Sequence, residues 1–111
     1  MRLLYNWYRD IGVEVPDSFG ELTLNNYLGV WKHDKKYALS VMIELFSTLG
    51  APVGNLDDIK RHDLLVVEEK GNLYAAIALG GKMAITSNIH HGVRTFFLGD
   101  LHRLVMARRM I

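Results

Sequence analysis

Residues 63–86 have the sequence DLLVVEEKGNLYAAIALGGKMAIT, and this stretch decides the fold. Two apolar runs, Leu64–Val67 and Leu73–Leu79, are separated by a polar cluster with a glycine, which predicts two strands joined by a tight turn. Gly80-Gly81 is a strong signal for a two-residue hairpin turn, after which Lys82–Thr86 is expected to return as a third strand. The stretch therefore predicts three antiparallel strands.

The second of these strands is apolar on both of its faces. Side chains alternate along a strand, so one face would carry Leu73, Ala75, Ile77 and Leu79, and the other Tyr74, Ala76 and Ala78. An amphipathic edge strand would have one polar face instead. We therefore expect this strand to be buried on both sides.

The segments before the strands have helical patterns. Apolar residues recur at helical spacing within Arg2–Ile11 and within Lys35–Leu49, which predicts two amphipathic helices. Asp34 can cap the second helix. The sequence SFGE, beginning at Ser18, matches a capping box and predicts a further short helix near that point.

Two more strands are predicted after the central stretch, at Val93–Leu98 and Arg103–Arg109. In the last strand Leu104 and Met106 are expected to lie on one side. In the strand before it, Val93, Thr95 and Phe97 alternate with Arg94 and Phe96. The chain is thus expected to form a single α+β domain, residues 1–111, with amino-terminal helices packed on a five-stranded antiparallel sheet.

The composition excludes several classes of protein. The 111 residues have a formal net charge of +1 with acids and bases interspersed, so the chain lacks the basic surplus of a general nucleic-acid binder. It has no cysteine, which excludes a thiol nucleophile and a disulfide framework. No apolar run approaches the ~20 residues of a membrane-spanning helix, and no signal peptide is evident. We predict neither a membrane span nor direct contact with nucleic acid.

The one local charge bias is cationic and lies in the last predicted strand. Arg103, Arg108 and Arg109 are clustered there, and we predict that they contact a partner protein. Half of the residues are hydrophobic, which is high for a small soluble domain and suits buried partner contacts.

The histidines raise the question of a metal site. His90 and His91 are adjacent, so on a strand they would point in opposite directions and could not easily bind one ion. The other three histidines have no partner at a metal-ligand spacing. Gly80-Gly81-Lys82 lacks the spacing and the following helix of a phosphate-binding loop. The residues themselves therefore predict no metal site, cofactor or catalytic constellation.

Four stretches carry a resemblance to a known family. LLYNWYRDIGVEVPD (3–17) has a helix that ends in a tyrosine–arginine–acid run and leads to a Gly-hydrophobic-x-hydrophobic-Pro exit. IKRHDLLVV (59–67) is a strand preceded directly by an acidic residue, Asp63, and His62 stands where the family named below usually has glycine. LYAAIALGGKMAITS (73–87) is a strand pair, and GVRTFFL (92–98) is the strand after it. In this order they resemble the NlpC-type cysteine peptidases, a compact branch of the papain-like fold that occurs in bacterial cell-wall hydrolases and phage tail proteins.

The resemblance implies that the family's catalytic positions have lost their residues in this chain. The nucleophilic cysteine falls at or before Met1, the histidine base falls on Tyr74, and the residue that orients the base falls on Ile85. A cysteine peptidase needs a thiolate, a base within hydrogen-bond reach and an orienting group. We therefore predict that the chain is not an enzyme and has no cofactor.

The resemblance and the lost triad together predict a structural protein of a phage virion, in the tail tip or baseplate. Its expected partners are other tail proteins of a multi-subunit assembly. One alternative is a binding or regulatory module of the bacterial cytoplasm that uses the former cleft near Tyr74 as a pocket. Another is a peptidoglycan hydrolase with relocated catalytic residues, His90 or His91 with Asp100.

Overall fold

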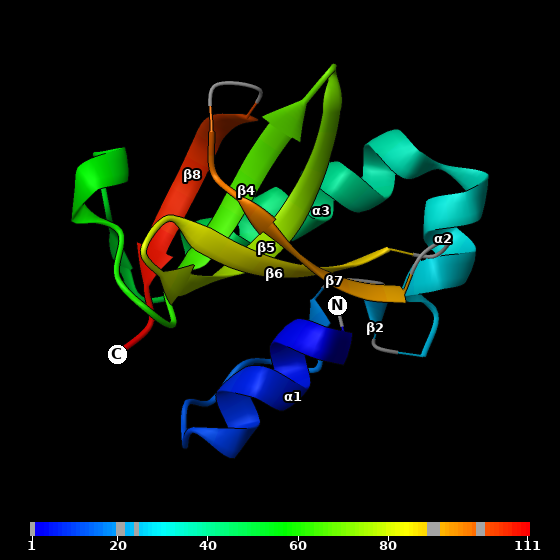
Figure 1. Ribbon diagram of the computed structural model, residues 1–111. Helices are drawn as coiled ribbons and strands as arrows, with labels where there is room; N and C mark the ends of the chain where they lie inside the picture. Colours follow the sequence, from blue (N-terminus) through cyan, green and yellow to red (C-terminus); the bar gives the residue numbers. More distant parts are fainter. Residues whose placement is uncertain (1, 20–21, 24, 89–91, 100–101) are drawn as a thin grey trace. The chain divides into compact units, whose positions relative to one another are not determined.

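The computed structural model describes residues 2–19, 22–23, 25–88, 92–99 and 102–111. The chain divides into two compact units, Met1–Leu49 and Gly50–Ile111. Within the described residues, three α-helices lie in the amino-terminal unit and a six-stranded antiparallel sheet lies in the second unit (Figure 1). The predicted α+β class is therefore confirmed, and the large sheet has one strand more than expected.

The first unit contains α1 (Arg2–Asp10), β1 (Ser18–Phe19), β2 (Leu22–Thr23), α2 (Tyr27–His33) and α3 (Lys35–Ser47). The short helix predicted near Ser18 is wrong, because β1 and β2 pair antiparallel there. The next helix begins only at Tyr27, after a reciprocal pair of hydrogen bonds. The amide of Thr23 donates to Oδ1 of Asn26 at 2.7 Å, and the amide of Asn26 donates to Oγ1 of Thr23 at 3.2 Å. Such side-chain acceptors stabilise a turn that leads into a helix.

The helix α3 begins at its predicted cap. The carboxylate of Asp34 accepts a hydrogen bond from the amide of Tyr37 at 3.0 Å, which satisfies one of the amides that a helix start leaves unpaired. The buried positions follow the predicted helical spacing and are Ala38, Met42, Leu45 and Phe46. The helix ends at Ser47, two residues before the predicted end.

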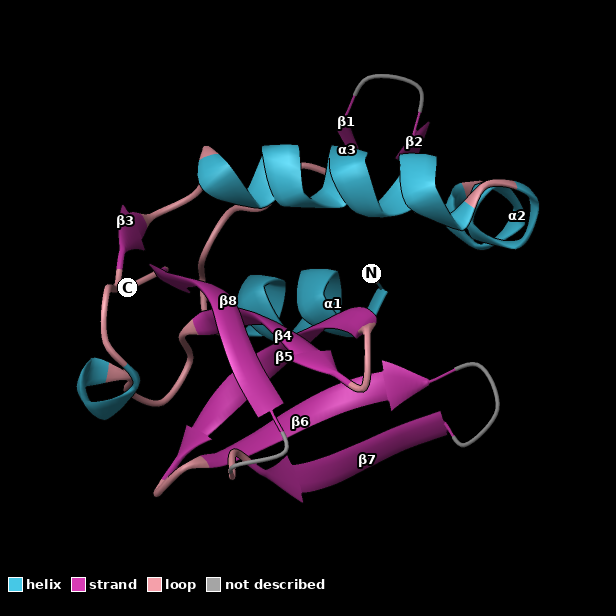
Figure 2. Ribbon diagram, turned by 90° about the horizontal axis from the view of Figure 1, so that it is seen from above, coloured by secondary structure: helices cyan, strands magenta, loops and turns pink. Residues whose placement is uncertain are grey.

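The second unit contains β3 (Ala51–Pro52), β4 (Leu64–Glu69), β5 (Asn72–Gly80), β6 (Met83–Asn88), β7 (Gly92–Phe97) and β8 (His102–Arg109). The strand order is β3-β8-β4-β5-β6-β7, so the last strand returns beside β4 rather than extending the sheet beyond β7. Figure 2 shows the strands fanning out from β8 through β4 and β5 to β6 and β7, as expected of a twisted sheet. The sixth strand, β3, was not predicted because it is only two residues long and contains a proline.

Both predicted hairpins are present, but the second turn consists of Gly81 and Lys82 rather than Gly80 and Gly81, because Gly80 still belongs to β5 and is paired with Met83. Lys70 and Gly71, with φ of 52° and 82°, join β4 to β5. Gly80, Gly81 and Lys82, with φ of 93°, 59° and 62°, lead from β5 into β6. Left-handed residues of this kind give hairpin turns a twist that matches the strands. The first turn is tighter than the predicted polar cluster, because its flanking polar residues belong to the strands.

The strand β5 is buried on both faces, as predicted. We call the inner face of the sheet the one that carries Tyr74, Ala76 and Ala78, which belong to a core cluster or pack against it. The other buried members of this cluster are Leu65, Val67, Ala84, Leu98 and Ala107. On the opposite, outer face, Leu64, Val66 and Ile77 are no more than 1% exposed. Burying a side chain of this size contributes about 1.5–3 kcal/mol.

A β-bulge in β8 corrects one prediction. The pairing with β4 runs from Met106 directly to Leu104, so Val105 is an additional residue in the ladder. Leu104 packs against the inner cluster, whereas Met106 is paired with Val66 on the outer face. The expectation that Leu104 and Met106 share one side is therefore wrong, because the extra residue reverses the alternation.

The entry to β4 has a left-handed residue. His62 has φ of 76°, a conformation that costs a non-glycine residue about 1–2 kcal/mol. Two backbone hydrogen bonds of 2.9 Å hold this entry against β5, from the amide of His62 to the carbonyl of Ala78 and from the amide of Ala78 to the carbonyl of Asp63. The backbone at this position therefore takes a conformation that favours glycine.

Candidate functional site

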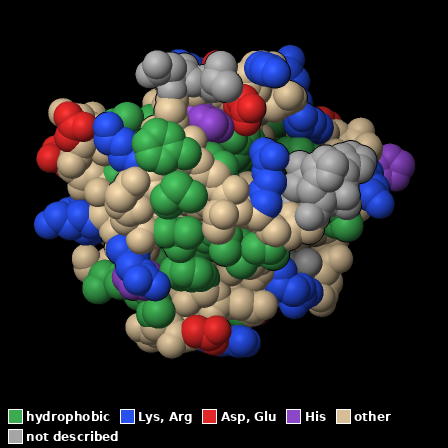
Figure 3. Space-filling view, viewed as in Figure 1, with side chains coloured by type: hydrophobic (Ala, Val, Ile, Leu, Met, Phe, Trp, Pro, Cys, Tyr) green, Lys and Arg blue, Asp and Glu red, His purple; other side chains and the backbone are tan. Residues whose placement is uncertain are grey.

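The strand β7 ends the sheet, and no further strand lies beside it in the described part of the chain. Phe96 packs against the inner cluster, whereas Val93 and Phe97 are 58% and 57% exposed. In the space-filling view, hydrophobic side chains gather over the region of β6 and β7 (Figure 3). An edge strand with exposed apolar side chains favours pairing with a strand of another chain. We call Val93, Thr95 and Phe97 the β7 edge.

The hydrogen-bond register shows which backbone groups of β7 point outward. The amide of Leu98 donates to the carbonyl of Lys82 at 2.7 Å, and the same register continues through Phe96 and Arg94. Alternate residues of an antiparallel strand bond to the same neighbour. The amides and carbonyls that point away from β6 are therefore those of Val93, Thr95 and Phe97. These three residues thus present both exposed side chains and outward-facing backbone groups.

A polar cluster lies on the inner face where four strands meet. The hydroxyl of Tyr74 donates to Oε2 of Glu69 at 3.1 Å, and Nε2 of His102 lies 3.2 Å from the same oxygen. The ring of Phe96 is 5.7 Å from the Tyr74 ring and 5.1 Å from the His102 ring, between centroids. Nδ1 of His102 is buried without a hydrogen-bond partner among the described residues. The cluster, which we call the Glu69 cluster, therefore joins β4, β5, β7 and β8.

Sequence reasoning missed this cluster, because its members are distant in the chain. Glu69 and His102 are direct neighbours across the pairing of β4 with β8. Neither residue has a local motif around it, and only the strand order reveals the contact. A histidine–carboxylate pair can serve in general base catalysis, but it then needs a nucleophile or a bound water to act on. The hydroxyl that approaches the carboxylate is instead that of Tyr74, which favours a structural role for the cluster.

The environment of Tyr74 makes its hydroxyl a weaker acid than that of an ordinary tyrosine. Burial, the hydrogen bond to Glu69 and the negative charge of that carboxylate raise the pKa of Tyr74 to about 12, although the charge of Arg94 acts in the opposite direction. The folded chain therefore holds this proton more tightly than the unfolded chain. The protonated Tyr74 hydroxyl therefore contributes to the free energy of unfolding. This contribution is fully present below pH 10, the ordinary pKa of tyrosine, and is lost as the pH rises through 12.

Removing the charge of Glu69 should lower the pKa of Tyr74. We expect Glu69→Gln to lower it from about 12 only in part, because burial, the largest cause, remains while the charge and the carboxylate acceptor both disappear. An NMR titration of the labelled Tyr74 ring would measure the change. Glu68→Gln is the matched control, since Glu68 is bonded to Arg103 instead. Equal pKa values of Tyr74 in the wild type and in Glu69→Gln would contradict this account.

The structure does not bring the predicted former catalytic positions together. Tyr74 belongs to the inner face, whereas Ile85 is paired with Ile77 on the outer face. Their side chains therefore lie on opposite sides of the sheet. Met1 lies outside the described residues, as do His90, His91 and Asp100. The roles that the resemblance implies for these positions stay predictions.

The three arginines predicted to contact a partner also have partners within the sheet unit. Arg109 donates from Nε and Nη2 to the carboxylate of Asp63, at 2.9 and 3.0 Å. Arg108 donates to the carbonyl of Gly50 at 3.1 Å, and Arg103 donates to the carboxylate of Glu68 at 2.9 Å. This last hydrogen bond lowers the pKa of the carboxyl group below its usual value.

The contribution of each arginine to a partner surface depends on its exposure. The side chain of Arg103 is 65% exposed, compared with 32% for Arg109. The predicted role in partner binding therefore suits Arg103 best. Arg109 is instead committed to the buried carboxylate of Asp63, which is 2% exposed.

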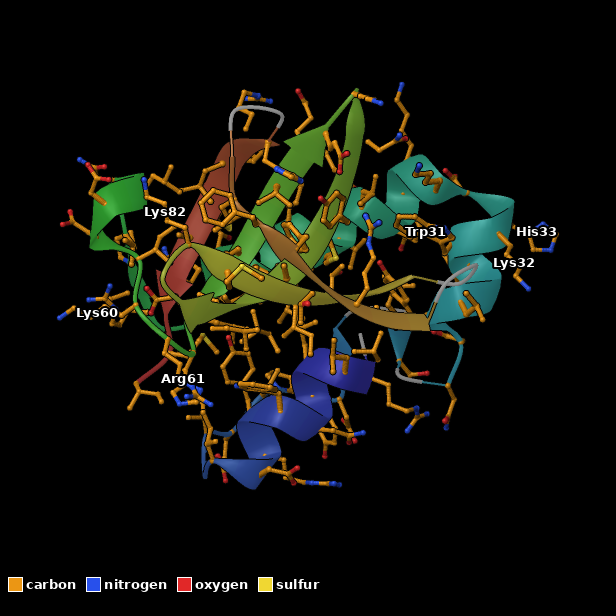
Figure 4. All side chains as sticks on the ribbon, in the orientation of Figure 1. Trp31, Lys32, His33, Lys60, Arg61 and Lys82 are labelled. Atoms are coloured by element: carbon orange, nitrogen blue, oxygen red, sulfur yellow. The ribbon has the colours of Figure 1, made fainter. Side chains whose placement is uncertain are left out.

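Other exposed cations are spread over separate turns. Lys60 and Arg61 come before β4, and Lys82 lies in the turn between β5 and β6; Figure 4 shows the three side chains pointing outward at one end of the sheet unit. Lys32 and His33 extend from the end of α2 (Figure 4). Among the described residues, no group of three histidine or acidic side chains could hold a metal ion. A helix long and apolar enough to cross a membrane is likewise absent from the described part of the chain.

One pocket lies within the first unit. Leu22, Tyr27 and Met42 are among its lining residues, and its volume is about 10 Å³, the room that a single water molecule needs. The hydroxyl of Tyr27 donates to Sδ of Met42 at 3.5 Å, and burial raises the pKa of Tyr27 to about 12. The pocket is far smaller than the several hundred Å³ of a typical small-molecule site.

Comparison with known proteins adds no assignment. The chain matches no protein-family model, and no curated protein is significantly similar to it. The geometry of the two units is therefore the basis for a functional proposal. Within that geometry, the β7 edge has no further strand beside it in the described part of the chain, whereas the Glu69 cluster and the Asp63–Arg109 pair both hold strands together.

Proposed function

We propose that this chain is a non-enzymatic assembly protein that binds other protein subunits through the β7 edge. One observation carries the proposal: Val93, Thr95 and Phe97 combine exposed side chains with outward-facing amides and carbonyls. Soluble proteins commonly protect such an edge with charge, proline or a covering segment. Apart from Arg94, β7 has no charged residue and no proline. An edge of this kind suits a protein that functions by pairing with a neighbour.

The proposal of a non-enzymatic role draws support from the residues at the implied catalytic positions. The sequence has no cysteine. Tyr74 is bonded to Glu69, and Ile85 has an apolar side chain that cannot orient a base. The proposed ancestry is an NlpC-type, papain-like fold, with the amino-terminal helices packed on the sheet and the reactive groups lost. This ancestry rests on the order of the four sequence stretches that resemble that family.

The assembly that this ancestry favours is the tail tip or baseplate of a phage virion, with other tail proteins as partners. Negative-stain microscopy of purified virions, labelled with an antibody to this chain, tests this location. Labelling at one end of the tail would support it, whereas particles that lack the chain would overturn it. Particles assembled with the Thr95→Pro variant, whose edge cannot accept a full strand, should carry less of the chain than wild-type particles.

A second candidate is a binding module of the bacterial cytoplasm, which would use the surface around Tyr74. One feature of the Glu69 cluster favours this second function: Nδ1 of His102 has no hydrogen-bond partner among the described residues, so it is available to a bound ligand. Location distinguishes the two functions, because a cytoplasmic module would be recovered in the cell extract and not in purified particles. A peptidoglycan hydrolase with relocated residues would clear a zymogram, and the assembly protein would not.

A further inference from the structure

We infer that the partner of the β7 edge is a second copy of this chain, paired with the first in an antiparallel register centred on Thr95. This inference rests on the proposed function, because it names the occupant of the same edge. The two sheets would form one continuous sheet across a two-fold axis, which is the common symmetry of a homodimer.

The sequence of the edge is complementary to itself. In an antiparallel pair centred on Thr95, Val93 lies opposite Phe97 of the copy, and the two Thr95 residues lie opposite each other. Aromatic side chains paired with β-branched ones, and threonine paired with threonine, stabilise neighbouring strands by about 0.2–1 kcal/mol per pair. All exposed side chains of the edge would thus have a partner of a favourable type.

The backbone groups fit the same register. The outward-facing amides and carbonyls belong to Val93, Thr95 and Phe97. In the register centred on Thr95 each of these residues lies opposite another of the three, so every outward group meets its complement. No amide or carbonyl of the edge would be left unpaired within this span.

The charge of Arg94 selects this register over its neighbours. Centred on Thr95, the pairing sets Arg94 opposite Phe96 of the copy. A shift toward the start of β7 would centre the pairing on Arg94 and set two guanidinium groups opposite each other, which is destabilising. A shift toward the end of β7 would leave Val93 opposite a residue beyond the strand. The register centred on Thr95 is therefore the one that satisfies side chains, backbone and charge together.

The contact is short, so the dimer is expected to be weak. Three residues from each strand form an interface below the size of stable complexes, and we expect a dissociation constant of the order of 1–100 μM. In an assembly, many copies held close together would raise the effective concentration. Sedimentation equilibrium of the purified chain over a range of concentrations would detect the association, and a chain that remains monomeric up to about 1 mM would overturn the inference.

The variant Thr95→Pro tests the role of the strand edge. The amide of Thr95 points away from β6, so replacing Thr95 by proline removes no hydrogen bond within the sheet. Proline lacks the amide hydrogen that a second strand would need, so the variant blocks pairing at this edge. We expect its dissociation constant to rise at least about tenfold, which corresponds to 1.4 kcal/mol. Thr95→Val is the matched control, because it keeps the amide and the branched shape, and it should dimerise like the wild type. Equal association of the proline variant, with an unchanged thermal unfolding curve, would overturn the inference.

A charge pair tests the register itself. Val93→Lys alone and Phe97→Glu alone should each weaken the dimer, because a charge would face an apolar residue. In the double variant each new lysine lies opposite a new glutamate of the copy, so association should recover. Recovery is specific to the register centred on Thr95, and a double variant weaker than both single variants would overturn it.

The outcomes separate this inference from the function on which it rests. A monomeric chain that is present in virions, and that is lost from them with Thr95→Pro, would overturn the homodimer and keep the assembly function. A dimeric chain that is absent from virions would keep the homodimer and overturn the virion location.

Discussion

Gly50→Ala should destabilise the sheet unit more than any other single methyl group added at a described glycine. Gly50 has φ of 57°, and a Cβ there would fall inside contact distance of the carbonyl oxygen of Arg109 and 2.9 Å from its carbon. Both atoms belong to the backbone of β8, next to its pairing with β3, so they cannot rotate away. We expect the free energy of unfolding to fall by at least about 3 kcal/mol, since the left-handed strain and the clash add together.

Chemical denaturation followed by circular dichroism would measure this loss. Gly71→Ala is the matched control, because Gly71 has a similar positive φ of 82° but open space around its Cβ position. The control should lose only the conformational part, about 1–2 kcal/mol. Equal losses in the two variants would show that the approach of Gly50 to Arg109 does not hold in solution.

Asp63→Ala should have the second largest effect. The Asp63 carboxylate is 2% exposed and accepts hydrogen bonds from Arg109 and from the amide of Lys60, at 2.8 Å. These bonds fix the entry to β4 and join it to the end of β8. Hydrogen bonds to charged groups contribute more than neutral ones, so we expect a loss of about 2–4 kcal/mol in the free energy of unfolding.

The matched control for Asp63 is Glu68→Ala. Glu68 also bonds an arginine of β8 from β4, but this pair is exposed, with the Arg103 side chain 65% accessible. Exposed ion pairs are largely screened by water, so we expect no measurable change in the denaturation midpoint. A loss in Glu68→Ala as large as that in Asp63→Ala would mean that burial does not distinguish the two pairs.

The features that sequence reasoning predicted well are those with a local cause. The hairpin turns at Lys70-Gly71 and at Gly81-Lys82, one residue later than predicted, follow from residues that tolerate positive φ. The start of α3 follows from the side chain of Asp34, which reaches the amide of Tyr37. Each of these signals acts within a few residues, so it can be recognised without knowing the rest of the fold.

Two predictions failed because pairing between strands overrode the local sequence pattern. The capping-box pattern at Ser18 predicts a helix start, but Ser18 pairs with Thr23 in the hairpin of β1 and β2, and the helix begins only after the turn formed by Thr23 and Asn26. The shared side of Leu104 and Met106 failed at a bulge, which depends on how β8 fits against β4. The pairing of strands and the position of a bulge depend on the sum of contacts along both strands, so they cannot be predicted from one segment alone.

The candidate site was predictable only in part. The alternation of Val93, Thr95 and Phe97 with Arg94 and Phe96 is visible in the sequence, and it is confirmed. Which set is exposed was not visible, because both sets contain apolar residues. The exposure follows from the strand order, which places β7 at the end of the sheet and turns Phe96 toward the core cluster.

By itself, the sequence determined the helices α1 and α3 and the five longer strands β4 to β8, since spacing, caps and glycines act over short distances. The tertiary structure alone decided that β8 returns beside β4, that His102 meets Glu69, and that β7 is left at the edge. Pairing between strands that are far apart in the chain depends on burial and hydrogen bonding summed over the whole sheet. No short stretch of sequence contains that sum.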